Sequence, residues 1–189
     1  MDTDTLTPNT TMDELCREMP GARRALFRHF HIGGCSSCGF QPTETIGEVC
    51  VRNENLDPQE VIAKVLEAHE QDEAMMITPS AAARELELEP DKTRFLDIRT
   101  REEYEAVHIP DSTFFTQEML QEAMGNWPRD EGLLIIVDHT GDRSLDAAAY
   151  FAGHGFENVR ALKGGIDAWS AVVDPSLPRY HLEPADQHA

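Results

Sequence analysis

Residues Leu133-Leu134-Ile135-Ile136-Val137 run directly into Asp138-His139-Thr140-Gly141-Asp142-Arg143-Ser144, and this stretch decides the fold of the second half of the chain. The five apolar residues have the pattern of a buried strand, and a helical pattern follows from Leu145 to Gly153. In α/β proteins anions bind where a strand ends in a tight loop that opens a helix, because the loop N–H groups and the helix N-terminus point at one spot. The stretch therefore predicts an anion cradle whose first residue is Asp138.

The same stretch resembles the active-site loop of a rhodanese domain, which reads strand, Cys-x-x-Gly-x-Arg-Ser, helix. Gly141, Arg143 and Ser144 match this pattern, whereas Asp138 stands where the sulfur-carrying cysteine belongs. Other segments that resemble rhodanese signatures occur in the right order: Asp97-x-Arg99, Glu103-Tyr104, His108-Ile109-Pro110 and Gly164-Gly165. The resemblance implies a rhodanese-like α/β domain with a parallel sheet over residues 75–180, and the alternation of strand and helix patterns independently favours such a sheet.

Aspartate at the first loop position changes what the loop can do. A thiolate can take up and release sulfane sulfur, because sulfur is a soft nucleophile and a good leaving group, and a carboxylate can do neither. We therefore expect no rhodanese sulfur transfer at residues 138–144, a degenerate loop retained for docking, with the Asp138 carboxylate accepting loop N–H bonds. We expect Arg143 to brace the loop and His139 to face solvent. Structural roles are expected for Asp97, Arg99 and His108.

Residues 11–72 predict a small all-α domain of four short helices. Thr11 with Glu14, and Thr45 with Glu48, have the spacing of capping boxes, and Asp57-Pro58 is a strong helix start. Glu70–Ala74 reads as a short polar connection to the second domain. Residues 1–10 and 181–189 are expected to be disordered tails.

A loop framed by glycines carries Cys35 and Cys38 between the second and third predicted helices. The helical segment resembles the hybrid-cluster-associated redox disulfide domain, and this resemblance implies thiol redox chemistry at the two cysteines. Two cysteines at this spacing can cycle between dithiol and disulfide, or one can hold a persulfide that the other releases. We assign thiol-redox or sulfane-sulfur handling to this pair. Cys16 and Cys50 fit helix positions as buried hydrophobic residues.

Two other hypotheses remain open for the same residues. Cys35, Cys38, His29 and His31 could ligate zinc or an Fe–S cluster, which would make the protein a metal carrier or sensor, with a homo-oligomer sharing a cluster as a variant. Alternatively, the protein is a non-catalytic adaptor whose thiols are idle. Under the redox hypothesis no cofactor is expected, and the sequence leaves open whether the protein is an enzyme.

The charge of the chain limits its partners. The formal net charge is −19, made up of −8 over residues 1–74 and −11 over residues 75–189, so we expect no nucleic-acid partner. Residues 1–10 lack the basic segment and apolar core of a signal peptide, and no apolar run is long enough to span a membrane. We therefore expect a cytoplasmic protein whose partner is a thiol- or sulfur-bearing protein.

Overall fold

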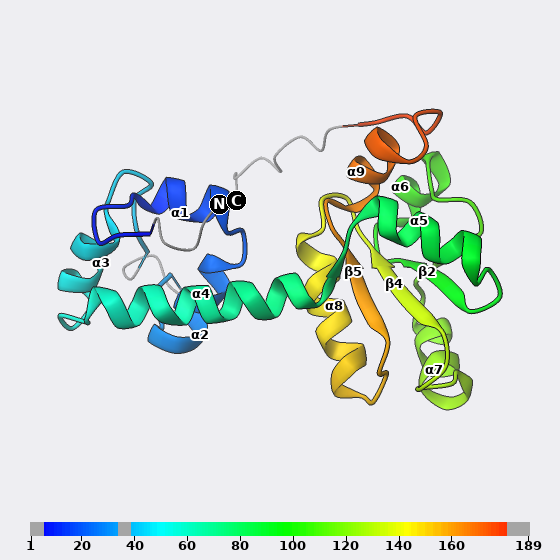
Figure 1. The fold of residues 1–189 in the computed structure, drawn as a ribbon, viewed down its shortest axis with the longest axis horizontal. Helices are drawn as coiled ribbons and strands as arrows, with labels where there is room; N and C mark the ends of the chain where they lie inside the picture. Colours follow the sequence, from blue (N-terminus) through cyan, green and yellow to red (C-terminus); the bar gives the residue numbers. More distant parts are fainter. Residues whose placement is uncertain (1–5, 34–38, 181–189) are drawn as a thin grey trace. The chain divides into compact units, whose positions relative to one another are not determined.

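The computed structural model describes residues 6–33 and 39–180. The chain divides into two compact units, Met1–Ala74 and Met75–Ala189, which we treat separately. The first unit is helical, and the second is a sheet covered by helices (Figure 1). In the part of the chain that the structure describes, no helix is both long and apolar enough to cross a membrane.

Four helices form the first unit: α1 (Met12–Glu18), α2 (Ala22–Phe30), α3 (Ile46–Arg52) and α4 (Pro58–Ala74). Both predicted capping boxes are confirmed, because Thr11 and Thr45 each accept from the backbone N–H three residues on and the matching glutamate accepts in return. The two helix starts are also paired with each other, since Met12 N–H donates to Glu44 O and Ile46 N–H donates to Thr10 O.

The core of the first unit is built from the apolar faces of these helices. Its fully buried members include Met12, Leu15, Leu26 and Val49. Leu6 packs against this core and Pro8 O accepts a hydrogen bond from Gly47 N–H, so the prediction of a disordered tail is wrong for residues 6–10. The rest of the two predicted tails, residues 1–5 and 181–189, lies outside the described residues.

The second unit contains a five-stranded parallel sheet in the order β1-β5-β4-β2-β3. The strands are β1 (Met76–Ile77), β2 (Thr93–Asp97), β3 (Thr113–Phe114), β4 (Leu133–Val137) and β5 (Val159–Leu162). β4 is central and pairs with β2 and β5. Because β4 lies between β2 and β5, the loop that follows Val137 leaves the sheet at its carboxyl edge. Ligands bind at this edge in open α/β sheets.

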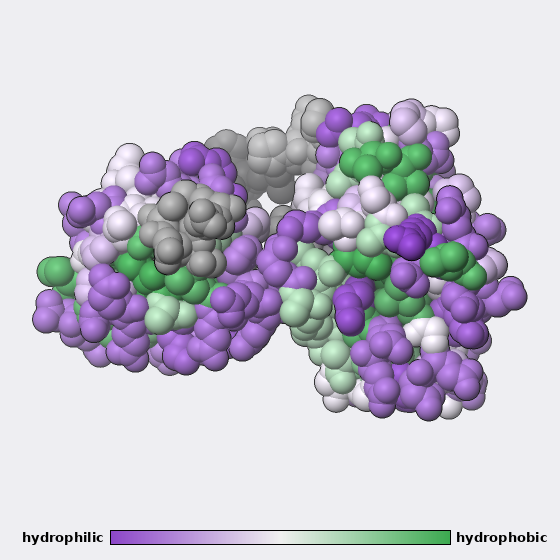
Figure 2. Space-filling model, in the orientation of Figure 1, coloured by the Kyte–Doolittle hydropathy of each residue, from purple (hydrophilic) through white to green (hydrophobic). Residues whose placement is uncertain are grey.

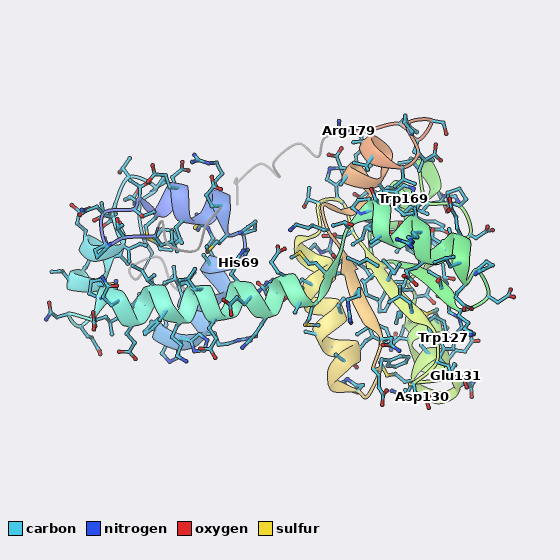
Figure 3. The ribbon with its side chains drawn as sticks, viewed as in Figure 1. His69, Trp127, Asp130, Glu131, Trp169 and Arg179 are labelled. Carbon is cyan, nitrogen blue, oxygen red and sulfur yellow. The ribbon has the colours of Figure 1, made fainter. Side chains whose placement is uncertain are left out.

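Helices cover both faces of the sheet: α5 (Pro79–Leu88), α6 (Arg101–Ala106), α7 (Gln117–Asn126), α8 (Asp142–Gly153) and α9 (Gly165–Val172). Alternate residues of β4 supply two cores, since Ile136 packs with α7 and α8 whereas Ile135 packs with α5 and α9. Trp169 of α9 packs edge-on against Phe95 of β2, with ring centroids 5.2 Å apart (Figure 3). The predicted α/β class with a parallel sheet is confirmed.

The structure corrects one local prediction and adds two features. Glu70–Ala74 is not a connection but the last part of α4. The helix α2 ends at Phe30, where His31 takes the left-handed conformation with φ 57°. The two-residue strands β1 and β3 were not expected, because segments this short carry no readable periodicity.

Candidate functional site

The loop between β4 and α8 is held by close backbone approaches. Gly141 has φ 99°, and a Cβ added there would lie 2.8 Å from Gly164 N. A Cβ on Gly165 would collide with the carbonyl oxygens of Asp138 and His139. Ser144 Oγ donates to Gly141 O at 3.0 Å. The loop is thus fixed on both sides, and its N–H groups have defined directions.

The Asp138 carboxylate occupies the space that these N–H groups enclose. Its side chain is buried, with 2% of the residue exposed. Oδ1 accepts the Gly141 N–H at 2.7 Å, and Oδ2 accepts the Arg143 N–H at 2.9 Å. Both carboxylate oxygens are therefore engaged by backbone donors of the loop. An anion bound in this cradle would have to displace an anion that belongs to the chain itself.

Arg143 and His139 differ from expectation. The Arg143 side chain is exposed, and it is the backbone N–H of this residue that contacts Asp138. His139 does not face solvent: its ring is half-buried and lies 4.4 Å from the Tyr180 ring, centroid to centroid. Its Nδ1 is buried and has no hydrogen-bond partner within residues 6–33 and 39–180. The side chain of Tyr180 covers it because the chain returns to the loop after α9.

A buried ion pair supports the end of β2 beside the loop. The Arg99 guanidinium and the Asp97 carboxylate are 2.6 Å apart, with side chains 1% and 0% exposed. Arg99 also donates to Val107 O and to Tyr180 Oη. Burial opposes the charge of Arg99, but the hydrogen bonds to Asp97 and Tyr180 outweigh it and raise the Arg99 pKa. These two residues hold the strand end in place.

Tyr180 joins this network to α6. Its hydroxyl accepts from Arg99 and donates to Glu103 Oε1, each at 2.8 Å. Burial, followed by the hydrogen bond to Glu103, raises the pKa of Tyr180 to about 12, although Arg99 acts in the opposite direction. The adjacent Arg179 forms two hydrogen bonds of 2.7 Å with Asp167 of α9 (Figure 3). The sequence gives no signal of the contact between Tyr180 and Arg99, because these residues are 81 positions apart.

His108 packs within the same unit. Its Nδ1 lies 2.8 Å from Tyr104 O, and its ring stacks on Tyr104 with centroids 4.3 Å apart. The Tyr104 hydroxyl donates to Ser112 O. These contacts agree with the expected structural role.

The remaining predicted site residues belong to the first unit. Cys35 and Cys38 lie outside the described residues, so their predicted roles stay predictions. Cys50 is fully buried, as expected, whereas Cys16 is only half-buried. Burial raises the pKa of both thiols, and Arg23 partly opposes this at Cys16. Neither environment therefore favours the reactive thiolate form.

His29 and His31 are both exposed. His29 lies in the last turn of α2, and His31 caps this helix just before the turn at Ile32-Gly33. Within residues 6–33 and 39–180, no three histidine, cysteine or acidic side chains gather in a way that would bind a metal. The predicted metal-ligand set also includes Cys35 and Cys38, which these ranges omit.

A family model for the rhodanese-like domain matches residues 78–172. The chain belongs to the rhodanese-like family. The matched segment lies within the second unit and includes the whole Asp138 loop. All four cysteines of the chain lie outside it.

Two curated relatives are named as sulfurtransferases. The chain is 32% identical over 77 residues to the thiosulfate sulfurtransferase GlpE of Pseudomonas savastanoi pv. phaseolicola, which covers 41% of this chain and 72% of GlpE. It is 30% identical over 92 residues to the adenylyltransferase and sulfurtransferase UBA4 of Candida albicans, which covers 45% of this chain and 21% of UBA4. The chain thus spans about a fifth of UBA4. At the level of the family, these relatives support sulfur transfer or sulfane-sulfur handling.

Among solved structures, the Alr3790 protein from Anabaena sp. is 25% identical, with a TM-score of 0.45. The similarity covers 51% of this chain and 87% of that one.

Proposed function

We propose that this protein handles thiols or sulfane sulfur through Cys35 and Cys38, and that its rhodanese-like unit is catalytically silent. The observation that carries the proposal is the buried Asp138 carboxylate, both of whose oxygens accept loop N–H bonds. No thiol is present at that position, and the loop donors are already engaged. Within a family whose chemistry is sulfur transfer, the sulfur carrier of this chain must then come from outside residues 78–172.

The proposed chemistry uses the two cysteines, a sulfur donor and, for repeated turnover, a dithiol reductant. The thiolate of one cysteine attacks the outer sulfur of a donor persulfide R–S–SH, which forms a protein persulfide and releases the thiolate R–S⁻. The second cysteine thiolate then attacks the inner, cysteine-bound sulfur of that persulfide. A protein disulfide forms and HS⁻ leaves, so the cysteine pair is oxidised by two electrons and the outer sulfur is reduced. A dithiol reductant would return the pair to its starting state.

The other two cysteines are poorer candidates. Cys50 is enclosed by the core, and the pKa of Cys16 is raised by burial. At neutral pH both are held as thiols, which are weak nucleophiles. This leaves Cys35 and Cys38 as the pair for which exchange chemistry is expected.

Under this proposal the Asp138 loop and its surroundings serve docking. Residues 138–144 keep the backbone form of an anion-binding loop while the Asp138 carboxylate occupies it. A partner would meet a pre-formed, rigid surface that cannot itself carry sulfur. Asp138→Asn keeps the shape of the side chain and removes its charge, so it tests whether that charge matters for docking.

The test is the sulfur that the protein takes from a low-molecular-weight persulfide, measured as cyanide-labile sulfur on the protein together with the HS⁻ that the second cysteine releases. We expect wild type and Asp138→Asn to yield sulfur in these two forms, and Cys35→Ser/Cys38→Ser to yield none. Cys16→Ser is the matched control, because it removes a half-buried thiol of the same unit. Equal loading of wild type and the double variant would refute the proposal.

A metal site is a second candidate function, favoured by one observation. His29 and His31 are exposed at the end of the helix that precedes the cysteine loop. Neutral imidazoles and thiolates together suit zinc or an Fe–S cluster. Metal analysis and the visible spectrum of anaerobically purified protein distinguish the two functions. Stoichiometric metal that is lost in both His29→Ala and Cys35→Ser would favour this second candidate.

A further inference from the structure

The surface of α2 differs in charge from the rest of the chain. Residues 22–31 contain three arginines and two histidines and no acidic residue, although the chain has 35 acidic and 16 basic residues. Helices of soluble proteins usually mix both signs on their exposed faces. Local positive charge on a strongly acidic protein therefore points to a specific role for this helix.

Helical spacing places the basic residues together. Arg23 and Phe27 are four positions apart on one face of α2, and His31, the residue that caps the helix, contacts the Phe27 ring and extends this line. Arg28 lies on the neighbouring line of the helix, four positions after Arg24. Arg23, Phe27, Arg28 and His31 are exposed, and Phe27 keeps 51% of its surface accessible. Phe27 and His31 are in edge-on contact, with ring centroids 6.1 Å apart. We call these four residues the α2 row.

Nearby acidic groups are engaged elsewhere. Arg24 pairs with Asp72 of α4 at 2.8 Å, and Lys64 pairs with Glu67 at 2.7 Å. Within the described ranges, neither Arg23 nor Arg28 takes part in an ion pair. The α2 row thus combines unneutralised guanidinium groups with an exposed aromatic ring. Arginine and aromatic residues are the types enriched where proteins bind each other.

Both flanks of the cysteine loop contact α2. His31, at one end of the row, precedes Cys35 by four positions. At the other end, the Arg23 guanidinium lies over the Phe40 ring, 4.8 Å from its centroid, and Phe40 follows Cys38 by two positions. A Cβ built on Gly33 would lie 3.9 Å from the Phe40 ring, so the two flanks are neighbours. A partner bound on the α2 row would be adjacent to both flanks.

We propose that the α2 row is the docking surface for an acidic protein segment that presents a thiol or a sulfane sulfur to Cys35 and Cys38. Opposite charges would steer such a segment to this helix, while the Phe27 ring would supply apolar contact area. The inference rests on the proposed function and adds the chemistry of the partner to it. A basic partner would be attracted by the chain as a whole and repelled at this helix.

The experiment uses three peptides that each carry one cysteine as a mixed disulfide with 5-thio-2-nitrobenzoate. The cysteine is flanked by glutamates, by lysines or by serines. A protein thiolate attacks the peptide sulfur, a protein–peptide disulfide forms, and the coloured thiolate leaves. Rates are measured at low and high salt in the Cys16→Ser background, so that only the loop cysteines and buried Cys50 remain.

We expect the glutamate peptide to react about tenfold faster than the lysine peptide at low salt, and the difference to shrink at high salt. The net charge of −19 taken alone predicts the opposite order. Arg23→Glu/Arg28→Glu should reverse the preference. Arg84→Glu/Arg101→Glu is the matched control, because it changes the net charge equally at exposed arginines of the second unit and should leave the preference intact.

The outcomes separate the two proposals. Loop cysteines that fail to react even with the serine peptide would refute the proposed function and, with it, the docking role. Cysteines that react with all three peptides at similar rates would refute the docking role alone. Similar rates together with a dimer that dissociates in Arg23→Glu/Arg28→Glu would assign the α2 row to a second copy of this chain, which also overturns the proposal. Arg28→Gln is the milder variant to use if Arg23→Glu/Arg28→Glu does not fold. It removes one positive charge, so it should weaken the preference for the glutamate peptide without reversing it.

Discussion

The two units of this protein differ in the side chains that they carry at their candidate sites. The second unit has a loop in which the N–H groups of Gly141 and Arg143 donate to one buried carboxylate, that of Asp138, and a buried Asp97–Arg99 ion pair lies at the end of the neighbouring strand β2. The first unit carries the cysteines on a small helical core, with exposed cations on α2. Hydrophilic residues dominate the visible surface of each unit, and each also shows smaller hydrophobic patches (Figure 2). The comparison shows that the second unit keeps a strand–loop–helix cradle whose centre holds a carboxylate, and under the proposed function the cysteines of the first unit carry the sulfur.

The largest expected effect concerns the two loop cysteines of the first unit. Cys35→Ser/Cys38→Ser should reduce the loading of sulfane sulfur to the background, because a serine hydroxyl at neutral pH is neither a thiolate nor a sulfur carrier. Thermal unfolding followed by circular dichroism should be unchanged, which shows that the fold is intact. Loading that persists in the double variant would move the chemistry to another residue.

The second prediction tests the proposed silence of the second unit by placing a thiol in its loop. Asp138→Cys places a thiol among the N–H groups of Gly141 and Arg143, which stabilise a thiolate. Thiosulfate:cyanide sulfurtransferase activity should rise from background to a measurable rate in this variant and stay at background in Asp138→Ser. Activity in the wild type that survives the loss of Cys35 and Cys38 would show that the loop is not silent.

The third prediction concerns the support of the cradle. Asp97→Asn leaves the Arg99 charge buried without its partner, and we expect the free energy of unfolding to fall by about 3–5 kcal/mol. Asp167→Asn removes one partner of the exposed Arg179 pair and should cost less than about 1 kcal/mol. Urea denaturation of the two variants measures this difference. Equal losses would mean that the buried pair contributes no more to the stability of the second unit than the exposed pair does.

The smallest effect concerns Tyr180. Tyr180→Phe loses the hydrogen bonds to Arg99 and Glu103 and should destabilise the second unit by about 1 kcal/mol at pH 7. Because the folded-state pKa is raised to about 12 from an unfolded value of about 10, the stability from this shift is present below pH 10 and lost as the pH rises toward 12. Wild type should therefore lose more stability than Tyr180→Phe across this interval. Parallel stability curves for the two proteins between pH 10 and 12 would contradict this.

The strong periodic segments were predictable, and the contacts across the chain were not. The strand Leu133–Val137, the capping boxes and the α/β class follow from local pattern, because each depends on residues within a few positions of one another. The polar residues of Glu70–Ala74 favour a helix but show no apolar stripe, so local pattern does not reveal that they continue α4.

The site itself could be predicted only in part. The engagement of Asp138 by loop N–H groups follows from the loop pattern, and the hydrogen bonds agree with it. The half-burial of His139 could not be anticipated, because it depends on Tyr180 returning to the loop from beyond α9. Cys16 was expected to be buried, but the end of α1 leaves it half-exposed beside Arg23. Such placements depend on tertiary packing that no local pattern encodes.

The most direct test of the central claim is to locate the added sulfur by mass spectrometry. The protein is incubated with a persulfide donor, alkylated and digested, and each cysteine peptide is weighed. The account predicts the mass of one extra sulfur atom, or an internal disulfide, on the peptide that contains Cys35 and Cys38, and unmodified Cys16 and Cys50 peptides. Added sulfur on Cys16 or Cys50 with the Cys35/Cys38 peptide unchanged would contradict it.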